Sequence, residues 1–481
     1  MRLKATALCR GIAVASAWLV ASLASVDALA LLPPVIERAF LDQRIPLSAV
    51  SVYVQEIGAA RPLVSHKASQ PMSPASTMKL LTTFAGLELL GPDYRWRTEA
   101  YADGPIAGGL LDGNLLLKGY GDPKVTIEQF QELVARLRAT GMSRIRGDLV
   151  LDRSYFSGPP YDPGAFDGEP LRSYNVGPDA LLVNFKTVRF VFSPNVAGDG
   201  VEVRIEPPLD SVAIRGAPLL AGGDCGDWRA GLRADFSSRP DAAEANFSGR
   251  YPVACGERDW YVSLLDHPHY VLGMFARSWA NAGGSFSGGV REGRVKRGAT
   301  PIATIESAPL YAMVSDINKL SNNVMARQLF LTLATTSFPP PATTENAAKA
   351  VERWLAGHKL KFPELVLDNG SGLSRRERIA AQSMARLLLA ADASKARGEY
   401  ISSLAVAATD GTVRKRFQND EVADQAFLKT GTLEGVRAIA GYVFAPTGKR
   451  LVVVCFVNHR NASRAQVPID LLVQWVYDNA R

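Results

Sequence analysis

Cysteine and histidine are scarce in this chain of 481 residues, which contains four cysteines and five histidines. His267 and His269 flank Pro268, but no third ligand at a suitable spacing accompanies them, so we expect no metal site. The chain has no Gly-x-Gly-x-x-Gly fingerprint, no P-loop and no Gly-x-Ser-x-Gly elbow. These absences argue against dinucleotide-binding, P-loop and α/β-hydrolase proteins, and we expect chemistry that uses no cofactor.

Signals for nucleic-acid binding are also missing. The formal net charge is +7, but the lysines and arginines are dispersed along the chain. No zinc-finger spacing, RNA-recognition motif or helix-turn-helix pattern accompanies them. A mildly basic protein suits an anionic cell envelope, and we expect no nucleic-acid partner.

Only one long apolar run is present, and it lies near the start of the chain. Arg2, Lys4 and Arg10 precede the apolar residues 11–26, and Ala28-Leu29-Ala30 follows them. This order of a basic region, an apolar region and a small-residue site predicts a signal peptide over residues 1–30, cleaved after Ala30. An uncleaved anchor is the alternative, but the run is short for a membrane span. We therefore expect an exported, periplasmic protein.

The cysteines fit this compartment. Cys9 lies in the predicted signal peptide, and Cys455 lies in an apolar run that predicts a buried strand with a free thiol. Cys225 and Cys255 lie in a loop-rich stretch, and an exported protein can keep a disulfide between them. Both the bonded and the reduced form remain open at this point, because two cysteines in one domain can stay reduced.

A Ser-x-x-Lys motif, Ser76 to Lys79, stands at the start of a predicted helix. We expect Ser73 to cap this helix, Pro74 to be its first residue and Gly91 to end it, because these residue types are favoured there. Residues three apart share one helix face, so the lysine amine can lie beside the serine hydroxyl. A lysine deprotonated by burial and a neighbouring cation can activate that serine. Taken alone, the motif fits a solvated helix start better than a catalytic site.

Ser321 and Asn323 lie at the junction of two predicted helices, over residues 310–320 and 324–334. Ser and Asn are common cap and turn residues, so a structural role explains them in isolation. In a catalytic site, the hydroxyl could relay a proton to a leaving amine. The amide could hold Lys79 and a substrate carbonyl.

Lys429-Thr430-Gly431 lies in a predicted strand over residues 427–433. A predicted antiparallel hairpin follows, with strands over residues 437–445 and 450–458. Lys429 beside the site would lower the pKa of Lys79 and bind an anionic substrate end, and Gly431 would let a substrate backbone approach closely. Alone, these residues are an ordinary strand end. Three motifs in one order, each in a fitting context, indicate a shared site.

Together the motifs resemble the Ser-x-x-Lys, Ser-x-Asn and Lys-Thr-Gly set of penicillin-recognising serine enzymes. About half of the chain separates Ser76 from Ser321. That interval is similar to low-molecular-mass class C penicillin-binding proteins, the D-alanyl-D-alanine carboxypeptidases and endopeptidases, whereas class A β-lactamases have a far shorter one. Asn322 stands where many relatives carry Asp, a side chain that the mechanism does not require. Three further segments resemble this family: Gly119-Tyr120-Gly121-Asp122-Pro123, Tyr174-Asn175-Val176-Gly177-Pro178 with Asn184 after it, and Asp368-Asn369-Gly370-Ser371-Gly372-Leu373-Ser374.

The resemblance implies an acyl-serine mechanism. Ser76 would attack the carbonyl of the penultimate D-alanine and Lys79 would take its proton. Ser321 would pass a proton to the departing D-alanine, and Asn323 would orient the substrate. Lys429 and two threonine hydroxyls would hold the terminal carboxylate, and the backbone N–H groups of Ser76 and Thr432 would form an oxyanion hole. The predicted catalytic residues are Ser76, Lys79, Ser321, Asn323 and Lys429, and the predicted substrate-binding residues are Thr430, Gly431 and Thr432.

The expected fold is α+β: a penicillin-recognising serine transpeptidase/β-lactamase-like domain, with helices on both faces of an antiparallel sheet, split by a β-rich insertion. Short alternating runs punctuated by Gly, Pro and Asp fill residues 94–252 and predict this insertion. The resemblance implies two inserted domains. The predicted ranges are 31–82 and 281–481 for the catalytic domain, 83–107 and 254–280 for a small second domain, and 108–253 for a β-rich third domain inserted in the second.

We therefore expect a serine peptidase that hydrolyses peptidoglycan stem peptides and cross-links, with β-lactam antibiotics as covalent inhibitors. A serine β-lactamase is one alternative, which rapid turnover of penicillin would reveal. A non-catalytic envelope-binding protein on the same fold is another, although five intact catalytic residue types argue against it. Peripheral membrane association is compatible with the sequence. The oligomeric state and the residues that recognise the third amino acid of the stem peptide do not follow from it.

Overall fold

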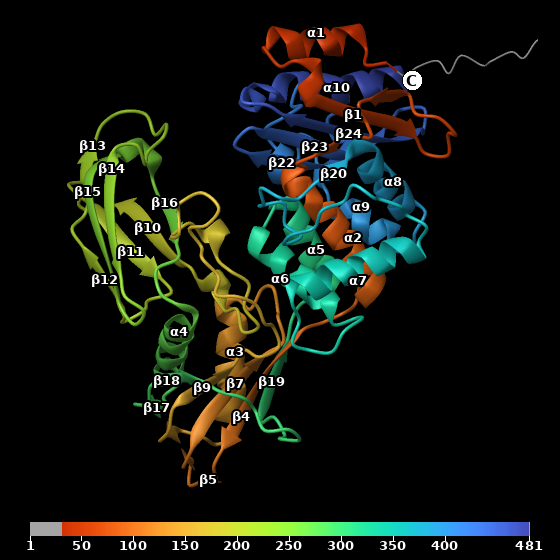
Figure 1. Cartoon of the computed structure of the whole chain (residues 1–481). Coiled ribbons are helices and arrows are strands. Elements are labelled where there is room, and N and C mark those ends of the chain that lie inside the picture. Colours follow the sequence, from red (N-terminus) through yellow and green to blue (C-terminus); the bar gives the residue numbers. More distant parts are fainter. Residues whose placement is uncertain (1–30, 481) are drawn as a thin grey trace, which may run out of the picture.

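The computed structural model describes residues 31–480 (Figure 1). The predicted signal peptide over residues 1–30 lies outside the described residues. None of the helices within the described part combines the length and the apolar character that a membrane span requires.

A six-stranded antiparallel sheet forms the centre of one lobe, in the order β2-β1-β24-β23-β22-β21. The predicted strand with Lys-Thr-Gly and the hairpin after it are confirmed as three neighbouring strands. The bounds are β1 Val50–Glu56, β2 Val64–His66, β21 Ala405–Val406, β22 Ala426–Leu433, β23 Val436–Phe444 and β24 Arg450–Asn458.

Helices cover both faces of this sheet (Figure 1). In β24, Val452 and Val454 pack into the core on one face, whereas Val453 and Cys455 pack into the core on the other. Successive residues of a strand point to opposite faces, so a strand covered on both sides reads as one apolar run. One face carries α1 Pro34–Asp42 and α10 Gln466–Asn479, and the other carries α2 Lys79–Leu90, α5 Leu310–Lys319, α6 Asn323–Ala334, α7 Thr344–Gly357, α8 Ala381–Asp392 and α9 Arg397–Ser402.

A second unit is built on a five-stranded sheet with the order β18-β9-β7-β4-β19 and on a small sheet with the order β17-β8-β6-β5. Two helices, α3 Ile127–Ala139 and α4 His267–Asn281, pack with these sheets in one hydrophobic core. The strand bounds are β4 Arg97–Asp103, β5 Ile106–Ala107, β6 Leu110–Leu111, β7 Asn114–Gly119, β8 Arg144–Ile145, β9 Leu149–Asp152, β17 Ser285–Phe286, β18 Val290–Glu292 and β19 Ala303–Glu306.

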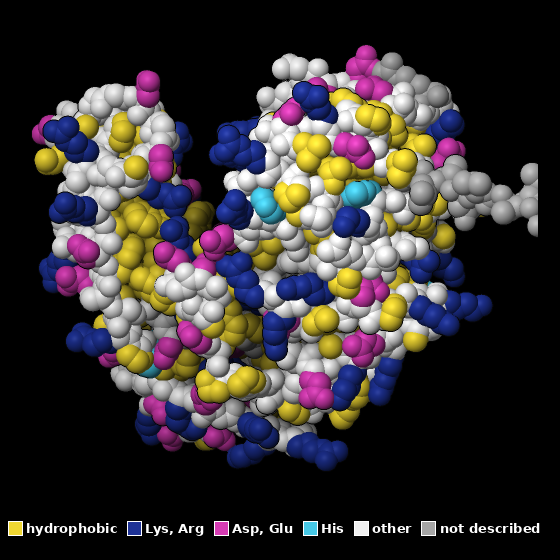
Figure 2. Space-filling view, turned by 45° about the horizontal axis from the view of Figure 1, so that its top comes forward, with side chains coloured by type: hydrophobic (Ala, Val, Ile, Leu, Met, Phe, Trp, Pro, Cys, Tyr) yellow, Lys and Arg dark blue, Asp and Glu magenta, His cyan; other side chains and the backbone are white. Residues whose placement is uncertain are grey.

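A third unit consists of strands and one short 3-10 turn, Val253–Cys255, with the strands arranged in two sheets around an aromatic core that includes Phe192 and Phe247. Cys225 and Cys255 are joined by a disulfide there, as the sequence allowed, and Cys455 is a buried free cysteine. The strands are β10 Val188–Pro194, β11 Val201–Glu206, β12 Val212–Arg215, β13 Leu219–Ala221, β14 Leu232–Ser238, β15 Ala243–Pro252 and β16 Arg258–Val262. Figure 2 shows open space between this unit and the catalytic lobe, and hydrophobic side chains lie on the side of the inserted part that faces this space.

The strand pairing differs from the predicted domain ranges. The predicted boundary after residue 82 falls inside α2, whose Phe84 and Leu87 are buried in the helical core. β18 and β19 fall in the range predicted for the catalytic domain, but they pair with β9 and β4. Similarly, β7 and β9 fall in the range predicted for the third domain, but they pair with each other, and β7 also pairs with β4. We propose domain ranges that follow these pairs: 97–152 and 267–306 for the second domain, and 188–262 for the third.

Candidate active site

Ser76 lies in a short 3-10 turn, Ala75–Met78, that leads directly into α2. Gly91 ends α2 with a φ of +84°, as predicted, but the prediction that Ser73 caps this helix is wrong. Over these described residues, neither the 3-10 turn nor α2 has a side-chain cap. The backbone N–H of Ser73 instead donates to Asn458 Oδ1 at 2.8 Å, and Asn458 Nδ2 donates to the Ser73 carbonyl at 3.1 Å. The end of β24 therefore holds the segment that precedes the serine.

The residue before the serine has an unusual backbone. Ala75 has a φ of +45°, in the left-handed region that residues with a Cβ rarely adopt. Gly372 packs against this turn so closely that a Cβ on it would lie 1.9 Å from the Ala75 carbonyl oxygen. Strained backbone of this kind persists only where the surroundings enforce it, and it is frequent at functional sites.

Lys79 lies beside Ser76, as the three-residue spacing predicted. Its Nζ donates to Ser76 Oγ at 3.0 Å, to Asn323 Oδ1 at 2.6 Å and to the Ser371 carbonyl at 2.5 Å. The side chain is fully buried. Three neutral oxygen atoms thus surround the amine, and one of them is the hydroxyl that it would deprotonate.

The pKa of Lys79 lies well below its ordinary value. Burial is the largest cause, and the positive charges of Lys429 and Arg327 lower the pKa further, while Glu377 raises it. Each effect acts on the charged form of the amine. The surroundings therefore favour the neutral amine, which is the form that a general base for a serine hydroxyl requires.

Ser321 and Lys429 form a second pair in the same site. Lys429 Nζ donates to Ser321 Oγ at 2.8 Å and to the Thr430 carbonyl at 2.9 Å. Ser321 lies between α5 and α6 with a φ of +57°, and Asn322 caps α6 by accepting the Met325 N–H at 3.0 Å. Burial lowers the pKa of Lys429 to about 7, so this lysine changes its charge near neutral pH.

The three predicted substrate-binding residues occupy one edge of the site on β22. The Thr430 hydroxyl donates to the Thr412 hydroxyl at 2.7 Å, and Thr432 is exposed. A Cβ on Gly431 would lie 2.7 Å from the Pro74 carbonyl oxygen and 3.0 Å from Ala75 Cβ. Glycine is therefore needed here for the close approach of β22 to the serine turn, a reason that the sequence alone did not reveal.

Two groups of the site escaped prediction. The Ser371 carbonyl contacts Lys79, although only the family-like segment around Ser371 was recognised. Arg327 is buried on α6 and donates to the Val176 carbonyl at 3.1 Å and to the Tyr161 hydroxyl at 2.6 Å. A backbone acceptor has no signature in a sequence, and an arginine inside an amphipathic helix looks like a surface residue.

The other two family-like segments lie against the same helix. Gln328 of α6 donates to the Asp122 carbonyl at 3.2 Å and to the Asp179 carbonyl at 2.7 Å, and it accepts the Asp179 N–H at 2.9 Å. α6 therefore carries Asn323 into the site at its start and joins the inserted segments to the catalytic domain one turn later.

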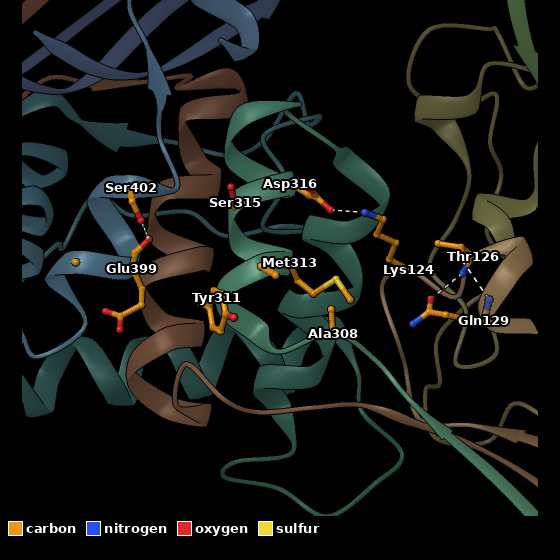
Figure 3. A pocket seen from close by; sticks show the side chains of 12 residues that line it. Lys124, Thr126, Gln129, Ala308, Tyr311, Met313, Ser315, Asp316, Glu399 and Ser402 are labelled. Carbon is orange, nitrogen blue, oxygen red and sulfur yellow. Dashed lines mark hydrogen bonds and ion pairs between the residues drawn. The ribbon is translucent and has the colours of Figure 1, made fainter. Parts of the chain in front are cut away.

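A cavity of about 840 Å³ lies between α5 and α9 of the catalytic domain and the start of α3 (Figure 3). Lys124 and Asp316 form an ion pair of 2.5 Å at its edge. Its lining contains none of the predicted site residues, so it is separate from the serine and lysine pairs. Over residues 31–480, no group of three or more His, Cys, Asp or Glu side chains could hold a metal ion.

Two known carboxypeptidases resemble this chain in sequence over most of its length. The chain is 26% identical over 428 residues to the D-alanyl-D-alanine carboxypeptidase DacB of Haemophilus influenzae, covering 87% of each chain. It is 27% identical over 440 residues to the D-alanyl-D-alanine carboxypeptidase of Actinomadura sp. strain R39, covering 87% of this chain and 79% of that one.

Solved structures confirm the predicted fold. Penicillin-binding protein 4 of Haemophilus influenzae superposes with a TM-score of 0.76 at 23% identity, covering 92% of this chain and 99% of that one. A predatory peptidoglycan endopeptidase of Bdellovibrio bacteriovorus superposes with a TM-score of 0.52 at 16% identity, covering 89% and 92%. The D-Ala-D-Ala carboxypeptidase 3 (S13) family matches residues 34–477, nearly all of the described part. The chain therefore belongs to the D-Ala-D-Ala carboxypeptidase 3 (S13) family.

Proposed function

We propose that this protein is an exported serine peptidase that removes the terminal D-alanine from peptidoglycan stem peptides and opens their cross-links. The observation that carries the proposal is the buried Lys79 amine, which contacts both Ser76 Oγ and Asn323 Oδ1. Family membership supports the reaction type, and the predicted signal peptide supports export to the periplasm.

Acylation begins when Ser76 Oγ attacks the carbonyl carbon of the penultimate D-alanine and the neutral Lys79 amine takes the hydroxyl proton. The oxyanion accepts hydrogen bonds from the backbone N–H groups of Ser76 and Thr432, which stabilise the charge that develops there. Ser321, which lies 2.8 Å from Lys429 Nζ, relays this proton from Lys79 to the nitrogen of the leaving group, so that the Lys79 amine is neutral again. The C–N bond breaks, D-alanine departs and an ester joins the remaining peptide to Ser76.

Water then completes the reaction. It attacks the ester carbonyl while Lys79 accepts one of its protons, and the proton returns to Ser76 Oγ as the C–O bond breaks. The peptide leaves with a new terminal carboxylate. Until D-alanine departs, its terminal carboxylate is held by Lys429 and by the hydroxyls of Thr430 and Thr432.

The same steps open a cross-link, because its amide also follows a D-alanine carbonyl and its leaving amine belongs to another stem. The fold shared with a predatory peptidoglycan endopeptidase supports this second substrate. A β-lactam amide would acylate Ser76 in the same way. The Haemophilus influenzae penicillin-binding protein 4 is known in complex with a β-lactam, and a Bdellovibrio bacteriovorus relative is known acylated by penicillin G, which supports covalent inhibition here.

The test is labelling with a fluorescent penicillin, followed by release of D-alanine from a stem peptide that ends in D-Ala-D-Ala. The wild-type protein should be labelled and should release D-alanine, whereas folded Ser76→Ala should do neither. Ser402→Ala is the matched control, since this exposed serine lines the separate cavity and should behave as wild type. Undiminished labelling of folded Ser76→Ala would overturn the proposal, and rapid loss of the label from wild type would favour a β-lactamase.

A further inference from the structure

One buried carboxylate organises the loop that contacts the catalytic lysine. Glu377 Oε1 accepts the backbone N–H groups of Asp368 at 3.3 Å, Asn369 at 3.0 Å and Gly370 at 2.7 Å. Glu377 Oε2 accepts the N–H of Gly372 at 2.8 Å. Both oxygens thus face N–H donors, an arrangement that suits the ionised carboxylate, which is an acceptor only.

The loop held in this way is part of the wall of the site. The Ser371 carbonyl accepts from Lys79 Nζ at 2.5 Å, and the Gly370 carbonyl accepts from the Thr82 hydroxyl at 2.6 Å. Gly372 packs against the Ala75 carbonyl. A shift of a few tenths of an ångström in this loop would therefore move an acceptor of Lys79 and the turn that carries the nucleophile.

Glu377 also contributes charge. It is fully buried, and none of its hydrogen bonds comes from a cationic side chain among the described residues. The charged groups that face Lys79 are Lys429 from β22, Arg327 from α6 and Glu377, while Asp368 faces Glu377 itself. Burial raises the pKa of Glu377, whereas its backbone hydrogen bonds lower it and so favour the ionised carboxylate. Ionised Glu377 is the one negative group, in the described part of the chain, that raises the pKa of Lys79.

We propose that Glu377 is a positioning residue for acylation, which holds the Ser371 carbonyl against Lys79 and supplies the negative charge that balances the buried cations. This role rests on the proposed function, because it acts through the base of that reaction. The role of Glu377 has two separable parts: it fixes the position of the Ser371 carbonyl, and it places a negative charge near Lys79.

The experiment measures the rate of Ser76 acylation by a fluorescent penicillin across the pH range for wild type, Glu377→Gln and Glu377→Asp. Glu377→Gln keeps the size of the side chain but removes its charge. The new amide NH2 group is a donor and cannot accept the hydrogen bond of the Gly372 N–H. Its acylation rate should fall about tenfold at neutral pH. The acid limb of its pH profile should move down by about one pH unit, since loss of the anion makes protonated Lys79 less favourable.

Glu377→Asp keeps the charge but shortens the side chain, so the rate should fall while the acid limb stays in place. Glu364→Gln is the matched control: Glu364 also accepts a backbone N–H, that of Ala380 at 3.1 Å, but does not contact the loop. It should retain the wild-type rate and profile. A merely structural role for Glu377 would lower the rate of both variants without moving the limb, and that result would overturn the charge part of the proposal.

A measurement on the wild type covers the case in which the variants do not fold. The amide protons of Asn369, Gly370 and Gly372 should exchange slowly with solvent, because they are bonded to a buried carboxylate. Rapid exchange at these amides would overturn the geometric part of the proposal. Wild-type protein that is not labelled at all would instead overturn the proposed function, whatever the variants do.

Discussion

The catalytic site buries Lys79 and Lys429 against neutral oxygen atoms, whereas the inserted part of the chain holds the half-buried Arg153 against carboxylates, one of which, Asp179, is buried. Arg153 Nε lies 2.7 Å from Asp179 Oδ2, and its Nη1 lies 2.5 Å from Glu292 Oε1. The two lysines instead contact hydroxyl, amide and carbonyl oxygens. Both regions take cations out of water, but only one of them supplies a direct counter-charge.

The protonation states follow this difference. Burial opposes the ionisation of Asp179, but His267 and Arg153 favour it, and the pKa of Asp179 falls below its ordinary value. Because burial lowers the pKa of His267 to about 4, this histidine is neutral near pH 7 and Arg153 supplies the charge. A paired buried charge is locked in one state and serves structure, whereas an unpaired one can lose its proton and serve chemistry.

Removing the partner in the inserted part should have the largest effect. Asp179→Ala leaves Arg153 with only the more exposed Glu292, so the unfolding free energy should fall by about 3–5 kcal/mol. Denaturant unfolding measures this loss. The hydrogen bonds between the backbone of residue 179 and the Gln328 side chain persist, so the folded fraction should still be labelled by penicillin.

Asp112→Ala is the control for that comparison, since the ion pair between Asp112 and Arg146 is largely exposed. Its loss should cost about 0–1 kcal/mol. Equal destabilisation by the two substitutions would mean that the burial of Asp179 does not matter.

In the cleft, Lys429→Ala should affect catalysis rather than stability. Acylation should slow on the order of a hundredfold, because the site loses a cation that binds the carboxylate and depresses the pKa of Lys79. With that pKa raised, a larger fraction of Lys79 is protonated at a given pH, so part of the lost rate should return at higher pH. Steady-state rates across the pH range, on a D-alanine-terminated peptide and on an ester that lacks the carboxylate, measure both effects.

If the carboxylate role dominates, the peptide should suffer more than the ester, and if the pKa role dominates, both should suffer alike. Lys429→Arg keeps the charge with a different shape and should retain partial activity. The exposed Lys349, paired with Glu345 on α7, provides Lys349→Ala as a control with unchanged rates. Wild-type rates for Lys429→Ala on both substrates would mean that the Lys-Thr-Gly motif has no catalytic role and is only the end of a strand.

The smallest effect on the catalytic site is expected for changes in the third unit, which contains a disulfide. Replacing Cys225 and Cys255 with serine should destabilise this unit by about 2–4 kcal/mol, mainly because its unfolded chain gains freedom. Limited proteolysis should then cut within residues 188–262 while penicillin labelling of Ser76 persists. Loss of labelling together with the cuts would show that the catalytic site depends on the stability of the third unit.

Local patterns in the sequence predicted most of the catalytic domain. The spacing of Ser76 and Lys79, the helices on either side of Ser321 and the hairpin after Lys429 all depend on neighbouring residues, and the structure contains each of them. The relation between Lys79 and Asn323 was available only through the family resemblance, because 244 positions separate them.

The prediction was wrong where distant segments decide the outcome. The strand over residues 303–306 joins β4 rather than the catalytic sheet, and nothing in its own residues specifies that partner. α4 begins only at His267, because the preceding Tyr261 pairs with the distant Arg189 in a strand. Glu377 reads as a surface residue in a charged run, and only the folded loop reveals its four backbone partners.

The pairing of β1 with β24 also determines when the enzyme is completed. Val52 lies opposite Cys455 in this pair, so strands from the two ends of the described chain lie side by side. During synthesis Ser76 emerges well before the strand with Lys429 and the two strands beyond it. A chain that stops before residue 426 contains the nucleophile but lacks Lys429. The order of synthesis thus delays reactivity until the strands that follow residue 426 have emerged.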